Sequence, residues 1–269
     1  MTSESSTVAP AGVAGAAAAL ELHDVSRRFG GHRAVDRVSF QVHAGTITGL
    51  IGPNGAGKTT VFNLIAGALQ PTGGRIALGD RRLDGQPPHR VLRAGVARTF
   101  QIPRPFGAMT VLENLMLAGQ DQPGERFWTN WLRPAAVAAG EQALRERASE
   151  LIEFVGLGAL AGAPARVLSG GQRKLLELAR ALMTTPRLLL LDEPAAGVNP
   201  ALVDAIAERI VALHHAGLTV LLIEHNLDLV MRLCRPVLVM AGGRLLREGD
   251  PEAVRTDPQV LEAYLGTRR

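Results

Sequence analysis

Apolar and polar residues alternate along the first part of the chain, a pattern that indicates β-strands with one buried face. Apolar side chains recur at short intervals through residues 20–29, and residues 38–42 alternate strictly. Residues 73–83 continue the pattern after two glycines and read as a hairpin. Because half-buried strands of this kind pair antiparallel, we expect a small antiparallel sheet made of these segments.

Other apolar runs are continuous rather than alternating. Residues 46–51, 187–191 and 218–223 are short and mostly apolar, which is typical of strands buried on both faces of a parallel sheet. Residues 95–100 predict one more strand, and residues 236–248 predict a closing hairpin around two glycines. These segments predict a second, larger sheet.

Between the strands, apolar residues follow the spacing of helices. Helices are expected over residues 60–66, from Thr110 onward, over residues 141–155 and over residues 250–265. Thr110 is followed three residues later by Glu113, the spacing of a capping box. Strands that alternate with helices predict an α/β fold.

Two stretches break both patterns. Pro103 and Pro105 exclude regular structure from residues 102–106. Residues 119–133 are polar and aromatic, with Trp128 among them, so we expect an exposed insertion there.

The composition is that of a globular protein in a reducing compartment. The 269 residues, 46% of them hydrophobic, are enough for one large α/β domain. The formal net charge of +4 is too small to demand a nucleic-acid partner. The single cysteine, Cys234, excludes an internal disulfide framework.

The chain begins with a tail rich in Ser, Thr, Ala and Gly. We expect residues 1–19 to be disordered and one domain to span residues 20–269. The tail contains Glu4 and no basic residue before Arg27, so it does not resemble a signal peptide. No apolar run approaches the ~20 residues of a membrane span. A cytosolic protein is therefore expected, unless a partner holds it elsewhere.

The segment after the apolar run 46–51 matches the phosphate-binding pattern G-x-x-x-x-G-K-[ST]. Its residues are Gly52, Pro53, Asn54, Gly55, Ala56, Gly57, Lys58, Thr59 and Thr60. The glycines let several backbone N–H groups converge, and the helix N-terminus adds positive charge. Lys58 would reach the β- and γ-phosphates of a nucleotide, and the Thr59 hydroxyl would bind Mg²⁺. A glycine-rich turn before a helix is the alternative interpretation.

A second glycine-lined helix start lies later in the chain. Its residues are Leu168, Ser169, Gly170, Gly171 and Gln172. Ser169 and Gln172 have the spacing of a capping box, so this helix start is a second potential anion site. From these residues alone, an ordinary well-capped helix is an equal alternative.

Polar residues that could bind a metal or transfer a proton follow the buried strands. Asp192 and Glu193 follow the run 187–191, at the edge where ligands bind in open parallel sheets. Asp192 could hold Mg²⁺, and Glu193 could accept a proton from an attacking water. His225 could contact the γ-phosphate or orient the nucleophile, with a structural role as the alternative. Phe29 could stack on adenine, with a core position as the alternative.

In this order, the motifs resemble those of the ATP-binding subunits of ABC transporters, over roughly residues 20–266. The resemblance implies a P-loop NTPase core with an antiparallel β subdomain and a helical, signature-bearing subdomain at about residues 102–183. It implies ATP and Mg²⁺ as ligands, with Gln101 as the Q-loop glutamine that contacts both. It also implies Phe29 as the adenine-stacking aromatic and His225 as the switch histidine. In the family, two subunits pair head to tail, and each signature closes on the other subunit's ATP.

Finer details are similar to the larger ATPase of branched-chain amino-acid importers. The shared segments are residues 52–54, 62–63, 97–101, 192–197 and 263–266. This resemblance implies import of branched-chain amino acids or of related amides or urea. The implied partners are two transmembrane permease subunits, a second ABC ATPase in a heterodimer or homodimer and, indirectly, a secreted substrate-binding protein. No nucleic acid is among them, and the chain would lie on the cytoplasmic face of the inner (plasma) membrane.

Two other functions stay open at this point. One is the ATPase of a lipid or lipopolysaccharide ABC export system, and the other is a soluble ABC ATPase of DNA repair or translation. The soluble class usually carries two cassettes or a coiled-coil insertion, and this sequence shows neither. One feature departs from the family pattern: the loop after Pro194 ends in Asn199 where Asp is usual. Because that loop contacts the opposite subunit in the family, we expect a weaker or different contact there.

Overall fold

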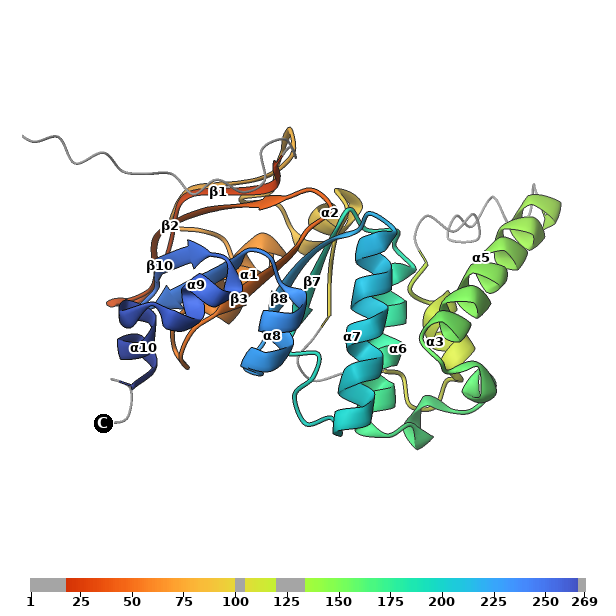
Figure 1. Ribbon diagram of the computed structural model, residues 1–269. Coiled ribbons are helices and arrows are strands. Elements are labelled where there is room, and N and C mark those ends of the chain that lie inside the picture. The colour runs from red at the N-terminus through yellow and green to blue at the C-terminus, as the bar shows by residue number, and fades with distance from the viewer. Residues whose placement is uncertain (1–17, 100–104, 120–133, 266–269) are drawn as a thin grey trace, which may run out of the picture.

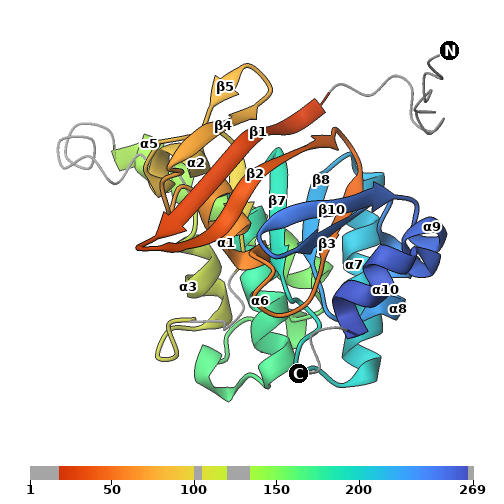
Figure 2. The ribbon, with the colours of Figure 1, turned by 90° about the vertical axis from the view of Figure 1, so that its left-hand side faces the viewer.

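The computed structural model of the protein describes residues 18–99, 105–119 and 134–265. Within these ranges the chain forms two β-sheets and a set of helices that cover them (Figures 1 and 2). Gln101, Trp128 and most of the N-terminal tail lie outside the described residues. The expectations for residues 1–17 and for the insertion at residues 120–133 therefore stay predictions.

The smaller sheet is antiparallel, as the alternating pattern predicted. Its strands, in the order β2-β1-β4-β5, are β2 (His32–His43), β1 (Ala18–Phe29), β4 (Gly73–Leu78) and β5 (Arg81–Arg82). Leu22 pairs with Phe40, and Val25 pairs with Val38, so the apolar positions of the two long strands share one buried face. β1 begins at Ala18, slightly before the boundary expected at residue 20.

The larger sheet has six strands in the order β10-β9-β3-β8-β7-β6. Its strands are β3 (Ile47–Ile51), β6 (Val96–Arg98), β7 (Leu188–Asp192), β8 (Thr219–Ile223), β9 (Val237–Ala241) and β10 (Arg244–Gly249). All pairs are parallel except the closing hairpin of β9 and β10. Every residue of β3, β7 and β8 is buried, which confirms the interpretation of the continuous apolar runs.

The helices include those expected from the apolar spacing. They are α1 (Lys58–Ile65), α2 (Pro88–Arg93), α3 (Val111–Met116), α5 (Pro134–Phe154), α6 (Gly170–Leu182), α7 (Pro200–His215), α8 (Leu227–Leu233), α9 (Pro251–Thr256) and α10 (Pro258–Leu265). Short 3-10 turns occupy Gly158–Leu160 and Ala165–Val167. The expected C-terminal helix is two helices, because Pro258 begins α10 and Asp257 is extended.

Each face of the six-stranded sheet is covered by its own layer. Leu188 and Leu190 face α1 and the antiparallel sheet, whereas Leu189 and Leu191 face helices that include α3, α5, α6 and α7. Figures 1 and 2 show α1 between the two sheets. Burial of apolar surface on both faces fixes the parallel strands, and their carboxyl ends meet at one edge. In the part of the chain that the structure describes, no helix is long and apolar enough to cross a bilayer.

Candidate nucleotide-binding and catalytic site

The phosphate loop connects β3 to α1 and requires glycine for two separate reasons. Gly52 and Gly57 have φ values of 148° and 101°, in the region that side chains disfavour. A Cβ on Gly52 would lie 2.1 Å from the Met240 carbonyl oxygen, and one on Gly57 would lie 2.5 Å from that of Ala34. Gly57 is also the N-cap of α1 and offers no side-chain cap. The first-turn N–H groups of α1 are therefore left for a ligand.

An open cleft of about 320 Å³ lies against this loop. Its lining residues are His32, Ala34, Asn54, Gly55, Ala56, Gly57, Lys58, Thr59, Thr60, Glu193 and His225. The cleft thus brings the predicted phosphate loop together with the predicted base and the predicted switch histidine. These groups come from the ends of three different strands, which supports their assignment to one site.

Lys58 is held at the centre of the loop. Its Nζ donates to the carbonyl oxygens of Gly52 at 2.6 Å and Pro53 at 3.0 Å, and its side chain is buried. Burial lowers the pKa of Lys58, although the nearby carboxylates of Glu193 and Asp192 act in the opposite direction. An ammonium with this little hydration is well placed to bind the anionic oxygens of a phosphate.

Asp192 lies at the end of β7 with its two oxygens in different environments. Oδ2 accepts a hydrogen bond from Arg98 Nη2 at 2.8 Å, and Arg98 Nη1 donates to Asn63 Oδ1 at 2.6 Å. Asp192 Oδ1 is buried, and among the described residues it has no hydrogen-bond partner. A divalent cation would supply the missing partner, and Thr59 offers a second oxygen in the cleft. These residues fit Mg²⁺.

Glu193, the predicted base, contacts the predicted switch histidine. His225 Nε2 lies 2.9 Å from Glu193 Oε1, and its side chain is 45% exposed. Glu224, just before it, is buried, and its carboxylate accepts from the N–H groups of Ala195 at 2.7 Å and His225 at 3.0 Å. Glu224 thereby holds the loops after β7 and β8 together. Sequence reasoning missed this role, although an acid directly after a buried strand was the available signal.

Phe29 is not a core residue. Its side chain is 44% exposed at the end of β1, and the Arg27 guanidinium carbon lies 4.8 Å from the ring centroid. Its strand partner His32 lines the cleft. The core alternative is therefore wrong, because the strand end carries the ring out to the surface. Stacking on adenine stays a prediction.

The signature segment caps α6 as predicted. Gln172 N donates to Ser169 Oγ at 3.2 Å, and Ser169 N donates to Gln172 Oε1 at 2.9 Å, so both halves of the capping box are present. Leu168 is buried, whereas Ser169 and Gly170 are exposed. Neither the segment nor its helix start lines the cleft at Lys58.

Asn199, where the family usually has Asp, is the N-cap of α7. Its Oδ1 accepts from Leu202 N at 2.9 Å. An Asp would make the same bond, so the departure keeps the cap and removes one negative charge. The expected effect on a contact with another subunit stays a prediction.

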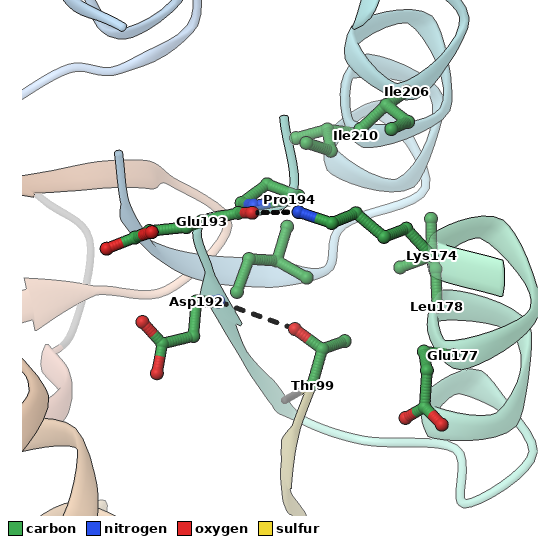
Figure 3. A pocket seen from close by; sticks show the side chains of 10 residues that line it. Thr99, Lys174, Glu177, Leu178, Asp192, Glu193, Pro194, Ile206 and Ile210 are labelled. Atoms are coloured by element: carbon green, nitrogen blue, oxygen red, sulfur yellow. Dashed lines mark hydrogen bonds between the residues drawn. The ribbon is translucent and has the colours of Figure 1, made fainter. Parts of the chain in front are cut away.

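Sequence reasoning also missed Arg98 and Lys174. Lys174, on α6, donates from Nζ to the main-chain oxygen of Glu193 at 2.6 Å (Figure 3). Arg98 and Lys174 reach the site from elements distant in sequence. Arg98 lies in the shared segment 97–101, but that resemblance gave it no role, and Lys174 belongs to none of the motifs quoted above.

Comparison with known protein families shows to which family the chain belongs. The family model described as ABC transporter matches residues 35–196, and the model described as branched-chain amino acid ATP-binding cassette transporter matches residues 245–269. The chain belongs to the ABC transporter family, as one of its ATP-binding cassettes.

Its relatives narrow the class further. The high-affinity branched-chain amino acid transport ATP-binding protein BraF of Pseudomonas aeruginosa is 43% identical over 248 residues, which cover 92% of this chain and 97% of BraF. LivG of Escherichia coli K12, with the same description, is 42% identical with the same coverage. The ADP conformation of MJ1267, an ATP-binding cassette of an ABC transporter, matches at 37% identity with a TM-score of 0.81, covering 93% and 99% of the two chains.

These matches confirm the predicted fold class and the family resemblance. The chain is an ATP-hydrolysing, nucleotide-binding subunit of an ABC transporter of the branched-chain amino-acid type. The export and soluble ATPase alternatives are not favoured.

Proposed function

We propose that the chain binds MgATP on its phosphate loop and hydrolyses it with Glu193 as general base, to drive import of branched-chain amino acids. The observation that carries the proposal is the contact between Glu193 and His225 in the same cleft as Lys58 and Thr59. The three groups a phosphate-transferring site needs are thus together: an anion cradle, a cation and a base.

The residues that line the cleft suggest how ATP would be hydrolysed. Lys58 and the first-turn N–H groups of α1 would bind the β- and γ-phosphates. A water would attack the γ-phosphorus and lose its proton to Glu193, while the bond to the bridging oxygen breaks to give ADP and phosphate. His225, hydrogen-bonded to Glu193, would keep the carboxylate oriented towards that water.

The metal would be held by Thr59 and by Asp192 Oδ1. The other carboxylate oxygen of Asp192, Oδ2, already accepts a hydrogen bond from Arg98. When bound, Mg²⁺ neutralises part of the charge on the β- and γ-phosphates. The family resemblance adds Gln101, which lies outside the described residues, as a contact to nucleotide and metal. It also adds Phe29 as the stacking partner of adenine.

We infer that the signature serves a second ATPase subunit. Ser169 and Gly170 are exposed at the start of α6, and the segment does not line this chain's own cleft. A triphosphate seated on Lys58 would therefore meet a signature only from another subunit, in a heterodimer or a homodimer. ATP would favour this closed pair because it binds the pair better than it binds the open subunits.

The relatives support a proposal for the cargo and the membrane partners. Proteins 41–43% identical to this chain are described as branched-chain amino acid transport ATP-binding proteins. We propose the same cargo class here, delivered by a secreted binding protein and moved through two permease subunits that hold the chain at the cytoplasmic face of the membrane. An uptake assay with radiolabelled leucine, in cells with and without this gene, tests the cargo, and unchanged leucine uptake without the gene contradicts it.

The base is tested by Glu193→Gln. The amide keeps the shape of the side chain but cannot accept the proton, so hydrolysis should fall roughly 10²–10⁴-fold while MgATP binding is kept. His225→Ala should also slow turnover with binding largely retained. A Glu193→Gln rate within threefold of the parent would give Glu193 a structural role instead.

A further inference from the structure

Lysine is rare in this chain and occurs only at the site. Of the 29 Lys and Arg residues, only Lys58 and Lys174 are lysines. Lys58 belongs to the phosphate loop. Lys174 lies just past the first turn of α6, the helix that starts at the signature, and neither the phosphate-loop motif nor the signature motif gives it a role.

The Lys174 ammonium ends on the main chain of the proposed base. Its Nζ donates to the Glu193 carbonyl oxygen at 2.6 Å, and the same oxygen also accepts from Ala196 N at 3.2 Å. Figure 3 shows the lysine side chain reaching across from α6 to this carbonyl. The contact therefore joins the signature helix to the loop after β7.

The surroundings suit a compact cation. Lys174 borders a small cavity of about 20 Å³, whose wall includes Leu178, Ile206 and Ile210. The cavity has room for about one water molecule. Burial lowers the pKa of Lys174, while the carboxylates of Glu224, Glu193 and Asp192 oppose that shift. A planar guanidinium is bulkier than the ammonium and directs its donors differently, so arginine is not an equivalent replacement here.

The main chain that Lys174 contacts has an unusual conformation. Glu193 has a φ of 50°, in the left-handed region that non-glycine residues rarely adopt. Its N–H donates to the Ile223 carbonyl oxygen at 2.9 Å, and its own carbonyl is held by Lys174. Because the N–H and the carbonyl of Glu193 are both hydrogen-bonded, its side chain leaves the end of β7 on the side opposite Lys174, as Figure 3 shows. The carboxylate then reaches His225.

We propose that Lys174 is a positioning residue for ATP hydrolysis: it holds the Glu193 main chain in the conformation that aims the carboxylate at the cleft, and it links the signature helix to the base of the same chain. The proposal rests on the proposed role of Glu193 as base. A shift of α6 when the signature closes on a partner's nucleotide would then reach this chain's own catalytic carboxylate through one hydrogen bond.

The test measures hydrolysis by the complete transporter carrying Lys174→Met in this chain. The variant should lower kcat roughly 10- to 100-fold, because a small misplacement of a catalytic group is costly, while the KM for ATP and MgATP binding stay within about twofold. Lys174→Arg keeps the charge but not the compact shape, and should recover part of the rate. Arg147→Met, which removes an exposed cation on α5, should match the parent.

A second arm asks whether Lys174 acts through Glu193. In a Glu193→Gln background, single-turnover hydrolysis should lose less than about threefold on adding Lys174→Met, because the two changes affect one group. The proposal is overturned if Lys174→Met keeps kcat within twofold, if its loss is equal in both backgrounds, or if only KM changes. Should the methionine variant lose its thermal transition, Lys174→Gln is measured in its place by the same criteria. A Glu193→Gln rate equal to the parent rate would refute the base assignment separately.

Discussion

The two glycine-lined helix starts of this chain are built in opposite ways. The N-cap of α1 is Gly57, which has a left-handed backbone and no side chain to cap the first-turn N–H groups. The N-cap of α6 is Ser169, whose side chain and that of Gln172 satisfy each other's backbone N–H groups. The start of α1 therefore gains most from an anion, whereas the start of α6 is already stabilised before any nucleotide approaches.

The two loop glycines and one of the two signature glycines also differ in what requires them. Gly52 and Gly57 are enforced by this chain's own backbone, which leaves no room for a Cβ at either position. In the signature, a Cβ on Gly171 would lie 2.0 Å from Leu202 Cδ2, whereas one on Gly170 would meet no atom within 4 Å. The packing of this chain therefore does not explain a glycine at position 170, and the proposed approach of a partner's nucleotide would explain it. The comparison supports the proposal that the phosphate loop binds this chain's nucleotide and that the signature serves a partner's.

The largest effect on nucleotide binding is expected at the phosphate loop, the site proposed for this chain's own nucleotide. Lys58→Ala removes a buried ammonium that backbone N–H groups replace only in part, so MgATP affinity should fall by roughly 10- to 100-fold. Equilibrium binding of a fluorescent ATP analogue measures the loss. Arg145→Ala, an exposed change on α5, serves as the control and should bind as the parent does. Unchanged binding by Lys58→Ala would refute the phosphate-loop assignment.

A pair of glycine variants sharpens the comparison. Gly52→Ala places a Cβ 2.1 Å from a backbone oxygen at a positive φ, so it should cost about 3 kcal/mol of folding free energy and impair nucleotide binding. Gly170→Ala should leave the melting temperature and MgATP binding at Lys58 unchanged, yet lower hydrolysis by the assembled transporter. Thermal unfolding and MgATP binding are measured for both variants. Equal destabilisation by the two substitutions would contradict the proposed difference between the two glycines.

Contiguous motifs could be read from the sequence, and contacts between distant residues could not. The phosphate loop and the signature each lie within nine residues or fewer, so local spacing reveals them, and the buried strands follow from apolar runs. Lys174 meets a residue 19 positions away, Ala195 meets Glu224 across 29 positions, and Arg98 meets Asp192 across 94. These pairings depend on the order of strands in the sheet, which no local pattern specifies.

Phe29 shows a related limit. Hydrophobicity alone favours burial of a phenylalanine, yet β1 ends at this residue and the ring lies 44% exposed. The pattern of apolar positions therefore gave a wrong expectation there, and the adenine stacking that the family resemblance implies stays a prediction.

A smaller effect concerns the contacts of Asp36 and the β9–β10 turn behind the phosphate loop, which we call the brace. Asp36 N donates to Gly243 O, and Gly243 N donates to Ala56 O, so the β9–β10 turn ties β2 to the loop. The hydrogen bond from Arg33 lowers the pKa of Asp36, with Arg244 adding to the effect against burial. Because the folded-state pKa is depressed, this contribution to stability is present above the ordinary pKa of 3.8 and is lost as the pH falls through the lower folded value.

Melting temperatures measured from neutral pH down to about pH 3 test this brace. Asp36→Asn should be less stable than the parent at neutral pH, and the difference should shrink as the solution becomes acidic. A difference that stays constant over the whole range would show that the Asp36 charge contributes nothing.

The central claim is that this chain's phosphate loop and its signature serve two different nucleotides. The most direct measurement uses the complete transporter with Ser169→Arg in this chain only, and follows photo-labelling of each ATPase subunit by azido-ATP together with hydrolysis at each loop. The account predicts that labelling of this chain at Lys58 persists, while hydrolysis of the nucleotide on the partner's loop is lost. Loss of labelling on this chain's own loop, with the partner's site intact, would contradict it.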